Sequence, residues 1–182
     1  MRVIAGKYKK TPLKTLEGMD ITRPTRDMVK EALFSTISIY SDTTFLDLFS
    51  GSGAIGIEAL SRGAKDAVFN DANRQACQII QDNLEKVREK RTVFFLDYAE
   101  CLFRLKDKRF DYIYVDPPYR FEEYDRVASL VRTNNVLAQD GTMIIEVRKE
   151  RDLPERYDDL CCCKEKKYGI NKLLYYRYGD KE

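Results

Sequence analysis

Short hydrophobic runs alternate with amphipathic segments over most of this 182-residue chain. Compact apolar runs indicate buried strands, and apolar residues that recur every three or four positions indicate helices. The pattern predicts strands at residues 44–49, 66–70, 92–96, 111–115 and 142–147, and helices at residues 54–62, 73–88, 98–106 and 121–137. Such alternation is typical of an α/β fold in which helices cover both faces of a mostly parallel sheet.

The two ends of the chain depart from this alternation. Residues 1–22 mix short apolar and basic stretches, which predicts a small N-terminal β-hairpin or arm, and an amphipathic helix is expected after Pro24. Residues 160–168 and 172–178 flank a glycine turn and predict an antiparallel hairpin. We expect a single domain, in which the basic arm is followed by a Rossmann-like core over residues 23–182.

A glycine-rich turn follows the first predicted strand. Gly51, Gly53 and Gly56 have G-x-G-x-x-G spacing between a strand and a helix, which is the context of a nucleotide-binding loop. Glycines there permit unusual backbone angles and let a ligand approach the main chain closely. The spacing by itself fits either a dinucleotide or S-adenosylmethionine (SAM).

Aspartates end four of the predicted strands. Asp47 precedes the glycine turn, and Asp71, Asp97 and Asp116 follow the next three strands. A dinucleotide brings an anionic pyrophosphate, which these acids would repel, whereas SAM brings a cationic sulfonium and amino group. Each aspartate alone could be a helix cap. Together the four favour SAM and disfavour a dinucleotide-dependent oxidoreductase.

The tetrapeptide Asp116-Pro117-Pro118-Tyr119 directly follows a hydrophobic run. Asp116 and the Pro117 carbonyl oxygen can accept hydrogen bonds from an NH2 group, and the two prolines stiffen the turn that carries them. Tyr119 offers a ring for base stacking, a contact worth roughly 1–3 kcal/mol. A rigid turn is the simplest interpretation of this tetrapeptide. Beside the glycine turn, however, it predicts a grip for the exocyclic amine of a nucleobase.

These motifs resemble the RsmD family, bacterial methyltransferases that modify the N2 amine of a guanine in small-subunit (16S) ribosomal RNA. The resemblance covers nearly the whole chain: residues 2–6 and 23–34 resemble the family's leader and first helix, residues 47–56 its cofactor loop, and residues 116–119 its catalytic turn. It implies a class I SAM-dependent methyltransferase, Rossmann-like, with a mostly parallel seven-stranded sheet and an antiparallel C-terminal hairpin. The chain departs from the family at the second strand end, where Asp71 and Asn73 replace a frequent Glu and Asp.

The motifs and the resemblance together assign roles to the candidate residues. The catalytic turn comprises Asp116, Pro117, Pro118 and Tyr119. Asp47, Gly51 and Gly53 are expected beside the methionine part of SAM, Asp71 at the ribose, and Asp97 with Tyr98 at the adenine; Phe49 is expected in the core or in the wall of the cofactor pocket. Candidates for RNA phosphate contacts are Arg2, Lys7, Lys9, Lys10, Arg23 and Arg26.

Charge supports an RNA partner. Residues 1–30 hold eight Lys or Arg against three Asp or Glu, although the whole chain has a formal net charge of only +2. A basic leader beside an acidic body fits an RNA-binding edge next to a cation-binding pocket. Lysines that guard a surface strand would give the same charge pattern. The expected partner is ribosomal RNA within a small-subunit particle or an assembly intermediate.

The cysteines and the hydrophobic runs argue against a metal-binding protein and against a membrane protein. The five cysteines include no C-x-x-C pair and the chain has no histidine, so we expect reduced thiols and no metal site. No apolar run is long enough to span a membrane, which favours a cytoplasmic protein. Two functions stay open beside the RNA enzyme: a DNA adenine-N6 methyltransferase, and a catalytically silent SAM-binding factor in ribosome assembly.

Overall fold

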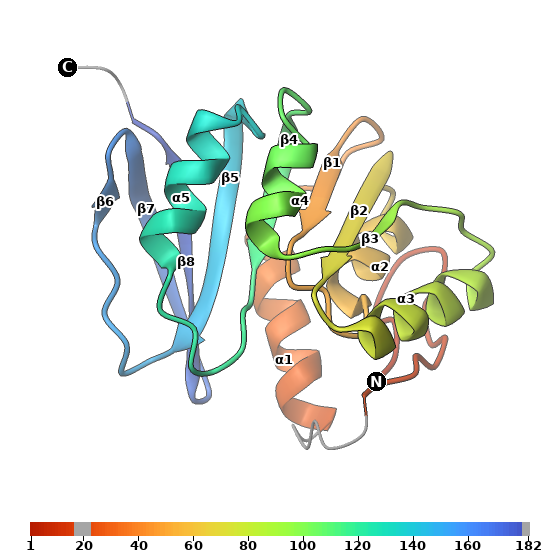
Figure 1. The fold of residues 1–182 in the computed structure, drawn as a ribbon. Coiled ribbons are helices and arrows are strands. Elements are labelled where there is room, and N and C mark those ends of the chain that lie inside the picture. The colour runs from red at the N-terminus through yellow and green to blue at the C-terminus, as the bar shows by residue number, and fades with distance from the viewer. Residues whose placement is uncertain (17–22, 180–182) are drawn as a thin grey trace.

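The computed structural model describes residues 1–16 and 23–179, without the side chains of residues 23–26. The described helices are α1 (Arg23–Phe34), α2 (Ala54–Ser61), α3 (Arg74–Lys86), α4 (Tyr98–Arg104) and α5 (Tyr124–Thr133). The described strands are β1 (Thr44–Asp47), β2 (Asp66–Asp71), β3 (Val93–Phe95), β4 (Phe110–Val115), β5 (Leu137–Arg148), β6 (Arg156–Tyr157), β7 (Leu160–Tyr168) and β8 (Asn171–Tyr178) (Figure 1).

The described strands form one sheet in the order β3-β2-β1-β4-β5-β8-β7-β6. The first five strands in this order, β3, β2, β1, β4 and β5, pair in parallel. The last three, β8, β7 and β6, pair antiparallel and extend the sheet at one side. The predicted α/β class and the C-terminal hairpin are therefore confirmed. The expected number of seven strands is one too few, because the two-residue strand β6 extends the antiparallel side. Two residues carry too little periodicity to be predicted.

The predicted helix over residues 121–137 is too long. Helix α5 ends at Thr133, and Asn135 has a left-handed φ of 54°. Leu137 already belongs to β5, where it pairs with Phe110 across a bulge, so this strand starts before the expected range of 142–147. Apolar residues at the end of α5 and the start of β5 merge into one apparent helical pattern, which only the left-handed turn interrupts.

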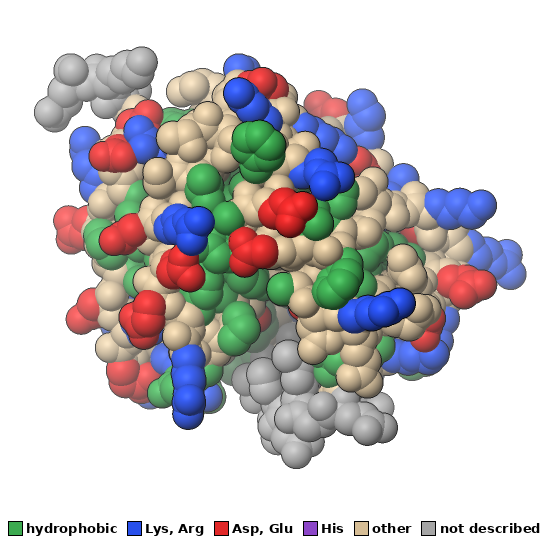
Figure 2. All heavy atoms as spheres, viewed as in Figure 1, with side chains coloured by type: hydrophobic (Ala, Val, Ile, Leu, Met, Phe, Trp, Pro, Cys, Tyr) green, Lys and Arg blue, Asp and Glu red, His purple; other side chains and the backbone are tan. Residues whose placement is uncertain are grey.

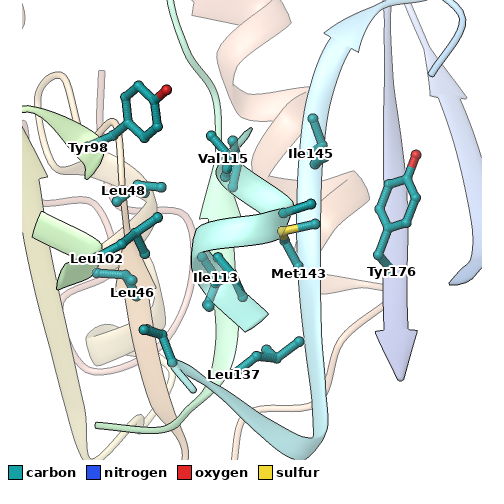
Figure 3. Packing of buried hydrophobic residues seen from close by; sticks show 14 of the residues in the cluster. Leu46, Leu48, Tyr98, Leu102, Ile113, Val115, Leu137, Met143, Ile145 and Tyr176 are labelled. Atoms are coloured by element: carbon teal, nitrogen blue, oxygen red, sulfur yellow. The ribbon is translucent and has the colours of Figure 1, made fainter. Parts of the chain in front are cut away.

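Two hydrophobic layers cover the sheet. One layer packs α4 and α5 against residues such as Leu46, Ile113 and Ile145 (Figure 3). The other packs α1, α2 and α3 against residues such as Phe45 and Tyr114. Because consecutive residues of a strand face opposite sides, continuous apolar runs fill both layers. No helix in the described ranges has the length and apolar character needed to cross a bilayer.

The N-terminal segment forms a small hairpin-like loop that lies on α2. Arg2 and Pro12 form an antiparallel bridge, which agrees with the predicted hairpin or arm. The backbone N–H groups of Ile4 and Ala5 both donate to the Glu58 carboxylate at 2.9 Å. Gly6 lies so close to α2 that an added Cβ would fall 1.9 Å from the Ser61 carbonyl oxygen.

Glu58 also joins α1 to α2. The side chain is fully buried and pairs with the buried ammonium group of Lys30 at 3.5 Å and with Arg62 at 3.0 Å. A buried carboxylate is tolerated when cations and N–H groups surround it in this way. Leader, α1 and α2 are thus held together through one side chain.

We expect Glu58→Ala to lower the free energy of unfolding by about 3–5 kcal/mol, because it leaves the buried Lys30 ammonium group without its opposite charge and two backbone N–H groups without their acceptor. Urea unfolding monitored by circular dichroism measures this loss. Glu100→Ala, on an exposed face of α4, is the control and should change stability by less than about 0.5 kcal/mol. A loss below about 1 kcal/mol in Glu58→Ala would contradict the joining role given to Glu58.

Candidate active site

Parallel pairing brings the strand-end acids of the middle of the sheet together. Asp47, at the end of β1, is level with Tyr114 of β4. Asp116 comes two residues after Tyr114, directly after the end of β4. Asp47 is close enough to Asp116 to affect its titration, and Asp71 affects that of Asp47 in the same way. Asp97 is exposed and caps α4 by accepting a hydrogen bond from the Ala99 N–H at 2.8 Å. Three of the four predicted acids therefore share one electrostatic environment.

The glycine turn lies between β1 and α2. Gly51 and Gly53 have left-handed φ angles of 56° and 77°, which glycine adopts without strain. A Cβ on Gly53 would lie 3.2 Å from Ile80, whereas one on Gly51 would meet nothing within 4 Å. Asp71 accepts hydrogen bonds from the N–H groups of Gly51 and Asn73, both at 2.8 Å. The turn is therefore tied to the end of β2 and presents an open side at Gly51.

Asp47 is the buried acid beneath this turn. It is 1% exposed and accepts a hydrogen bond from the Gly56 N–H at 3.2 Å. Burial raises the pKa of Asp47 to about 7; the Gly56 hydrogen bond opposes this rise and the charge of Asp71 adds to it. A cation placed here would favour the ionised form and would itself be stabilised.

The turn at residues 116–119 is open to solvent. A second turn follows it directly, closed by the Phe121 N–H, which donates to the Pro118 carbonyl at 2.9 Å. Tyr119 is 79% exposed, and the Arg148 guanidinium lies 5.7 Å from its ring centroid. Asp116 is accessible on one side, but the surrounding protein, and then the charges of Glu146 and Asp47, raise its pKa well above the ordinary range.

An aromatic cluster lies beside this turn. Phe49 and Tyr98, both cofactor candidates, are 5.7 Å apart between ring centroids, and Phe121 lies 5.3 Å from Phe49 and 5.4 Å from Tyr98. Tyr98 is almost completely buried and donates from its hydroxyl to Glu123 at 2.6 Å. Burial, assisted by Glu123, raises the pKa of Tyr98 to about 12. Phe49 and Tyr98 therefore meet as packed rings, and Tyr98 is already committed to a protein partner.

Sequence reasoning missed three residues of this region. Phe121 completes the aromatic cluster, and Asn70, just before Asp71 in β2, buries an amide oxygen that has no hydrogen-bond partner among the described residues. Glu146, at the end of β5, is 7% exposed and lies beside Asp116. For Glu146 a signal existed, because it is an acid inside the apolar run from Ile144 to Val147.

The basic candidates divide into paired and unpaired side chains. Arg2 pairs with Asp27 at 3.4 Å and Lys7 with Glu89 at 3.0 Å. Lys9 and Lys10 are exposed and form no ion pair with the described residues. The side chains of Arg23 and Arg26 lie outside the described structure.

The N-terminus lies on the side of the sheet where the parallel strands end. Figure 1 shows it there together with the start of α1 and the loop from β4 to α5. By contrast, the face that α4 and α5 cover carries acidic and basic side chains mixed together (Figure 2). The chain start and the turn at residues 116–119 thus lie toward the same side of the molecule, whereas Lys7 lies at the last turn of α2, where its N–H donates to the Ser61 carbonyl at 2.8 Å.

A separate cavity of about 550 Å³ lies at the antiparallel side of the sheet. Residues 153–156, 161–165 and Leu174 line it, and it contains none of the predicted site residues. All five cysteines are free thiols, and three of them lie in this lining. In the described ranges, no three His, Cys, Asp or Glu side chains gather as metal ligands would.

The residues at the strand ends fit SAM better than a dinucleotide. Asp47 and Asp71 supply carboxylates for a cationic ligand, and the open side at Gly51 leaves room for close approach. A pyrophosphate would instead face two acids.

Comparison with known proteins supports this interpretation. The sequence model of the family described as "Conserved hypothetical protein 95" matches residues 1–177. YlbH of Bacillus subtilis (strain 168) is 37% identical over 182 residues, covering 97% of this chain and 98% of that protein. "Ribosomal RNA small subunit methyltransferase D" of Haemophilus influenzae is 33% identical over 186 residues, covering 97% and 93%. The solved structure of Escherichia coli yhhF superposes with a TM-score of 0.81 at 27% identity, covering 100% and 99%.

The fold and the strand-end site define a class I SAM-dependent methyltransferase. Within this class the chain belongs to the family described as "Conserved hypothetical protein 95", which is the RsmD family that its motifs resemble.

We expect the affinity for SAM to rise by up to about tenfold between pH 6 and pH 8. Asp47, with a pKa of about 7, is mostly protonated at pH 6 and mostly ionised at pH 8, and a cationic ligand binds the ionised form better. Isothermal titration calorimetry at pH 6, 7 and 8 measures this rise. Asp47→Asn is the matched control, because it should bind more weakly and lose the part of the pH dependence that Asp47 causes. Identical pH profiles for the two proteins would refute this role of Asp47.

Proposed function

We propose that this protein transfers a methyl group from SAM to the N2 amine of a guanine in small-subunit (16S) ribosomal RNA. The observation that carries the proposal is that the glycine turn and the turn at residues 116–119 lie at one edge of the parallel sheet. Support for the substrate comes from the family and from relatives named as small-subunit ribosomal RNA methyltransferases. Neither a DNA adenine methyltransferase nor a silent assembly factor finds support among these names.

We assign the cofactor to the strand ends of β1, β2 and β3. Asp47 would face the cationic part of SAM, and Gly51 and Gly53 would allow its close approach. Asp71 would accept from the ribose hydroxyls, and Asp97 with Tyr98 would lie at the adenine. When bound, SAM supplies an activated methyl group on a positively charged sulfur.

We assign the base-binding role to the turn at residues 116–119. A guanine amine is a weak nucleophile, because its lone pair is delocalised into the ring. Hydrogen bonds donated by this amine to Asp116 and to the Pro117 carbonyl would orient the lone pair and favour a pyramidal nitrogen. Asp116 would also stabilise the positive charge that develops on the nitrogen. Tyr119 would stack on the guanine after it leaves the RNA stack.

We further propose that the basic leader docks the RNA. Lys9 and Lys10 are exposed and form no ion pair within the described structure, and they belong to the basic leader, whose first residue lies on the side of the sheet that carries the catalytic turn. Phosphate contacts of this kind position a substrate without reading its sequence. The natural substrate is then RNA in a small-subunit particle or assembly intermediate, which implies a cytoplasmic location.

Asp116→Ala should abolish methyl transfer and leave SAM affinity within a few-fold of the wild type, because it removes an amine acceptor from the base-binding side. Mass-spectrometric mapping of ribosomal RNA from cells without this protein should show one guanine that has lost its N2-methyl group. Wild-type protein and the control Asp125→Ala, an exposed position on α5, should restore it, and Asp116→Ala should not. Restoration by Asp116→Ala would exclude the catalytic role, and an unchanged RNA map would exclude the substrate.

Lys9→Glu combined with Lys10→Glu should raise KM for RNA, with kcat little changed. The slope of log KM against log salt concentration should fall by the equivalent of about two phosphate contacts. Steady-state kinetics at several salt concentrations measures both effects. Lys106→Glu combined with Lys108→Glu, beyond the end of α4, is the matched charge control. If both pairs change KM equally, the leader is not the docking surface.

A further inference from the structure

Glu146 is a buried acid beside the catalytic turn for which the mechanism above has no use. Ile145 of β5 pairs in parallel with Val115 of β4, and Glu146 and Asp116 are the next residues of the two strands. The register therefore puts two carboxylates on neighbouring strand ends. Glu146 is 7% exposed.

Hydrogen-bond donors, not cations, surround the Glu146 carboxylate. The Tyr114 hydroxyl donates to one oxygen; the Tyr168 hydroxyl, at 2.5 Å, and the Asn171 amide, at 2.7 Å, donate to the other. No lysine or arginine of the described residues forms an ion pair with it, and the nearby buried Lys172 pairs with Asp152 and Glu165 instead. Three donors match the acceptor capacity of an ionised carboxylate.

The charge of Glu146 acts on Asp116. Two carboxylates in one site resist ionising together, so that one of them holds its proton more tightly. Desolvation by the surrounding protein is the largest cause of the raised pKa of Asp116, although solvent still reaches this residue; the charge of Glu146 is the next cause, and that of Asp47 on β1 follows. The other titratable groups around Asp116 are the hydroxyls of Tyr114, Tyr168 and Tyr124, which carry no charge at neutral pH.

We propose that Glu146 is a positioning residue that makes Asp116 a stronger acceptor for the proton leaving the guanine amine. This inference rests on the proposed function, because it deepens the role given to Asp116. The amine nitrogen would use its lone pair to bond the methyl carbon while the carbon–sulfur bond breaks and its electrons stay on the sulfur, which becomes a neutral thioether. The nitrogen then carries a positive charge and a surplus proton. The proton bonds to an Asp116 oxygen while the electrons of the N–H bond return to nitrogen, which leaves a neutral methylamine and a neutral Asp116. Glu146 contacts neither the guanine nor SAM in this proposal and acts only through Asp116.

The test compares pH–rate profiles of Glu146→Gln, Glu146→Asp and wild type. Glu146→Gln removes the charge but keeps the shape, and its amide can donate to the tyrosine oxygens. We expect the acid limb of kcat/KM to move to lower pH by roughly one unit and kcat to fall roughly tenfold, with KM for RNA unchanged. Glu146→Asp keeps the charge and should retain the wild-type limb and most of the rate. Glu165→Gln, a carboxylate-to-amide change on β7, is the matched control and should leave the limb in place.

A second measurement uses the ligand-free wild-type protein and needs neither methyl transfer nor a variant at Glu146. Carbon-13 NMR of the side-chain carboxyl groups, with the Asp116 signal identified by Asp116→Asn, should show the Glu146 signal responding as Asp116 titrates. Independent single-step titrations, or an unshifted acid limb in Glu146→Gln, would overturn the role of Glu146. If the ribosomal RNA map shows no lost methylguanine while the Glu146 signal still responds to the titration of Asp116, the proposed function is overturned and the electrostatic coupling of Glu146 to Asp116 stands.

Discussion

The parallel pairing of β1, β4 and β5 is the constraint on which the site depends. It carries three chain segments to one edge, and each has an acid at or near the end of its strand: Asp47, Asp116 and Glu146. Carboxylates gathered without a neighbouring cation are costly, and the fold accommodates them by donating hydrogen bonds and by raising pKa values. An edge with this electrostatic character attracts a cationic ligand and repels phosphate.

Another carboxylate, Glu58 on α2, has the opposite surroundings. Glu58 receives two cations and two backbone N–H groups, so its charge is compensated inside the protein. Through Glu58 the leader becomes part of the packing of α2, the helix that starts at the glycine turn. A segment that looks like a loose basic arm in the sequence is thus coupled to the element that shapes the cofactor side of the site.

The sequence predicted the fold class, the order of helices and strands and the C-terminal hairpin, because periodicity reports which face of an element is buried. It also predicted that strand-end acids would gather, and the structure brings Asp47, Asp71 and Asp116 into one environment while Asp97 caps a helix. Periodicity does not say which strands are neighbours. The meaning of Glu146 depends on the pairing of β4 with β5, and that of Glu58 on the return of the leader to α2.

The contact between Arg148 and Tyr119 has a consequence for how a base reaches the site. The guanidinium already occupies one face of the exposed ring. A purine must therefore displace Arg148 or use the opposite face, and displacement exchanges a cation–π contact of about 0.5–1 kcal/mol for a base stack of roughly 1–3 kcal/mol. The released guanidinium would then stand beside the incoming nucleotide, where its charge can pair with the phosphate that the nucleotide brings. Arg148 would thus cover the Tyr119 ring before the base arrives and would contact the phosphate of the nucleotide afterwards.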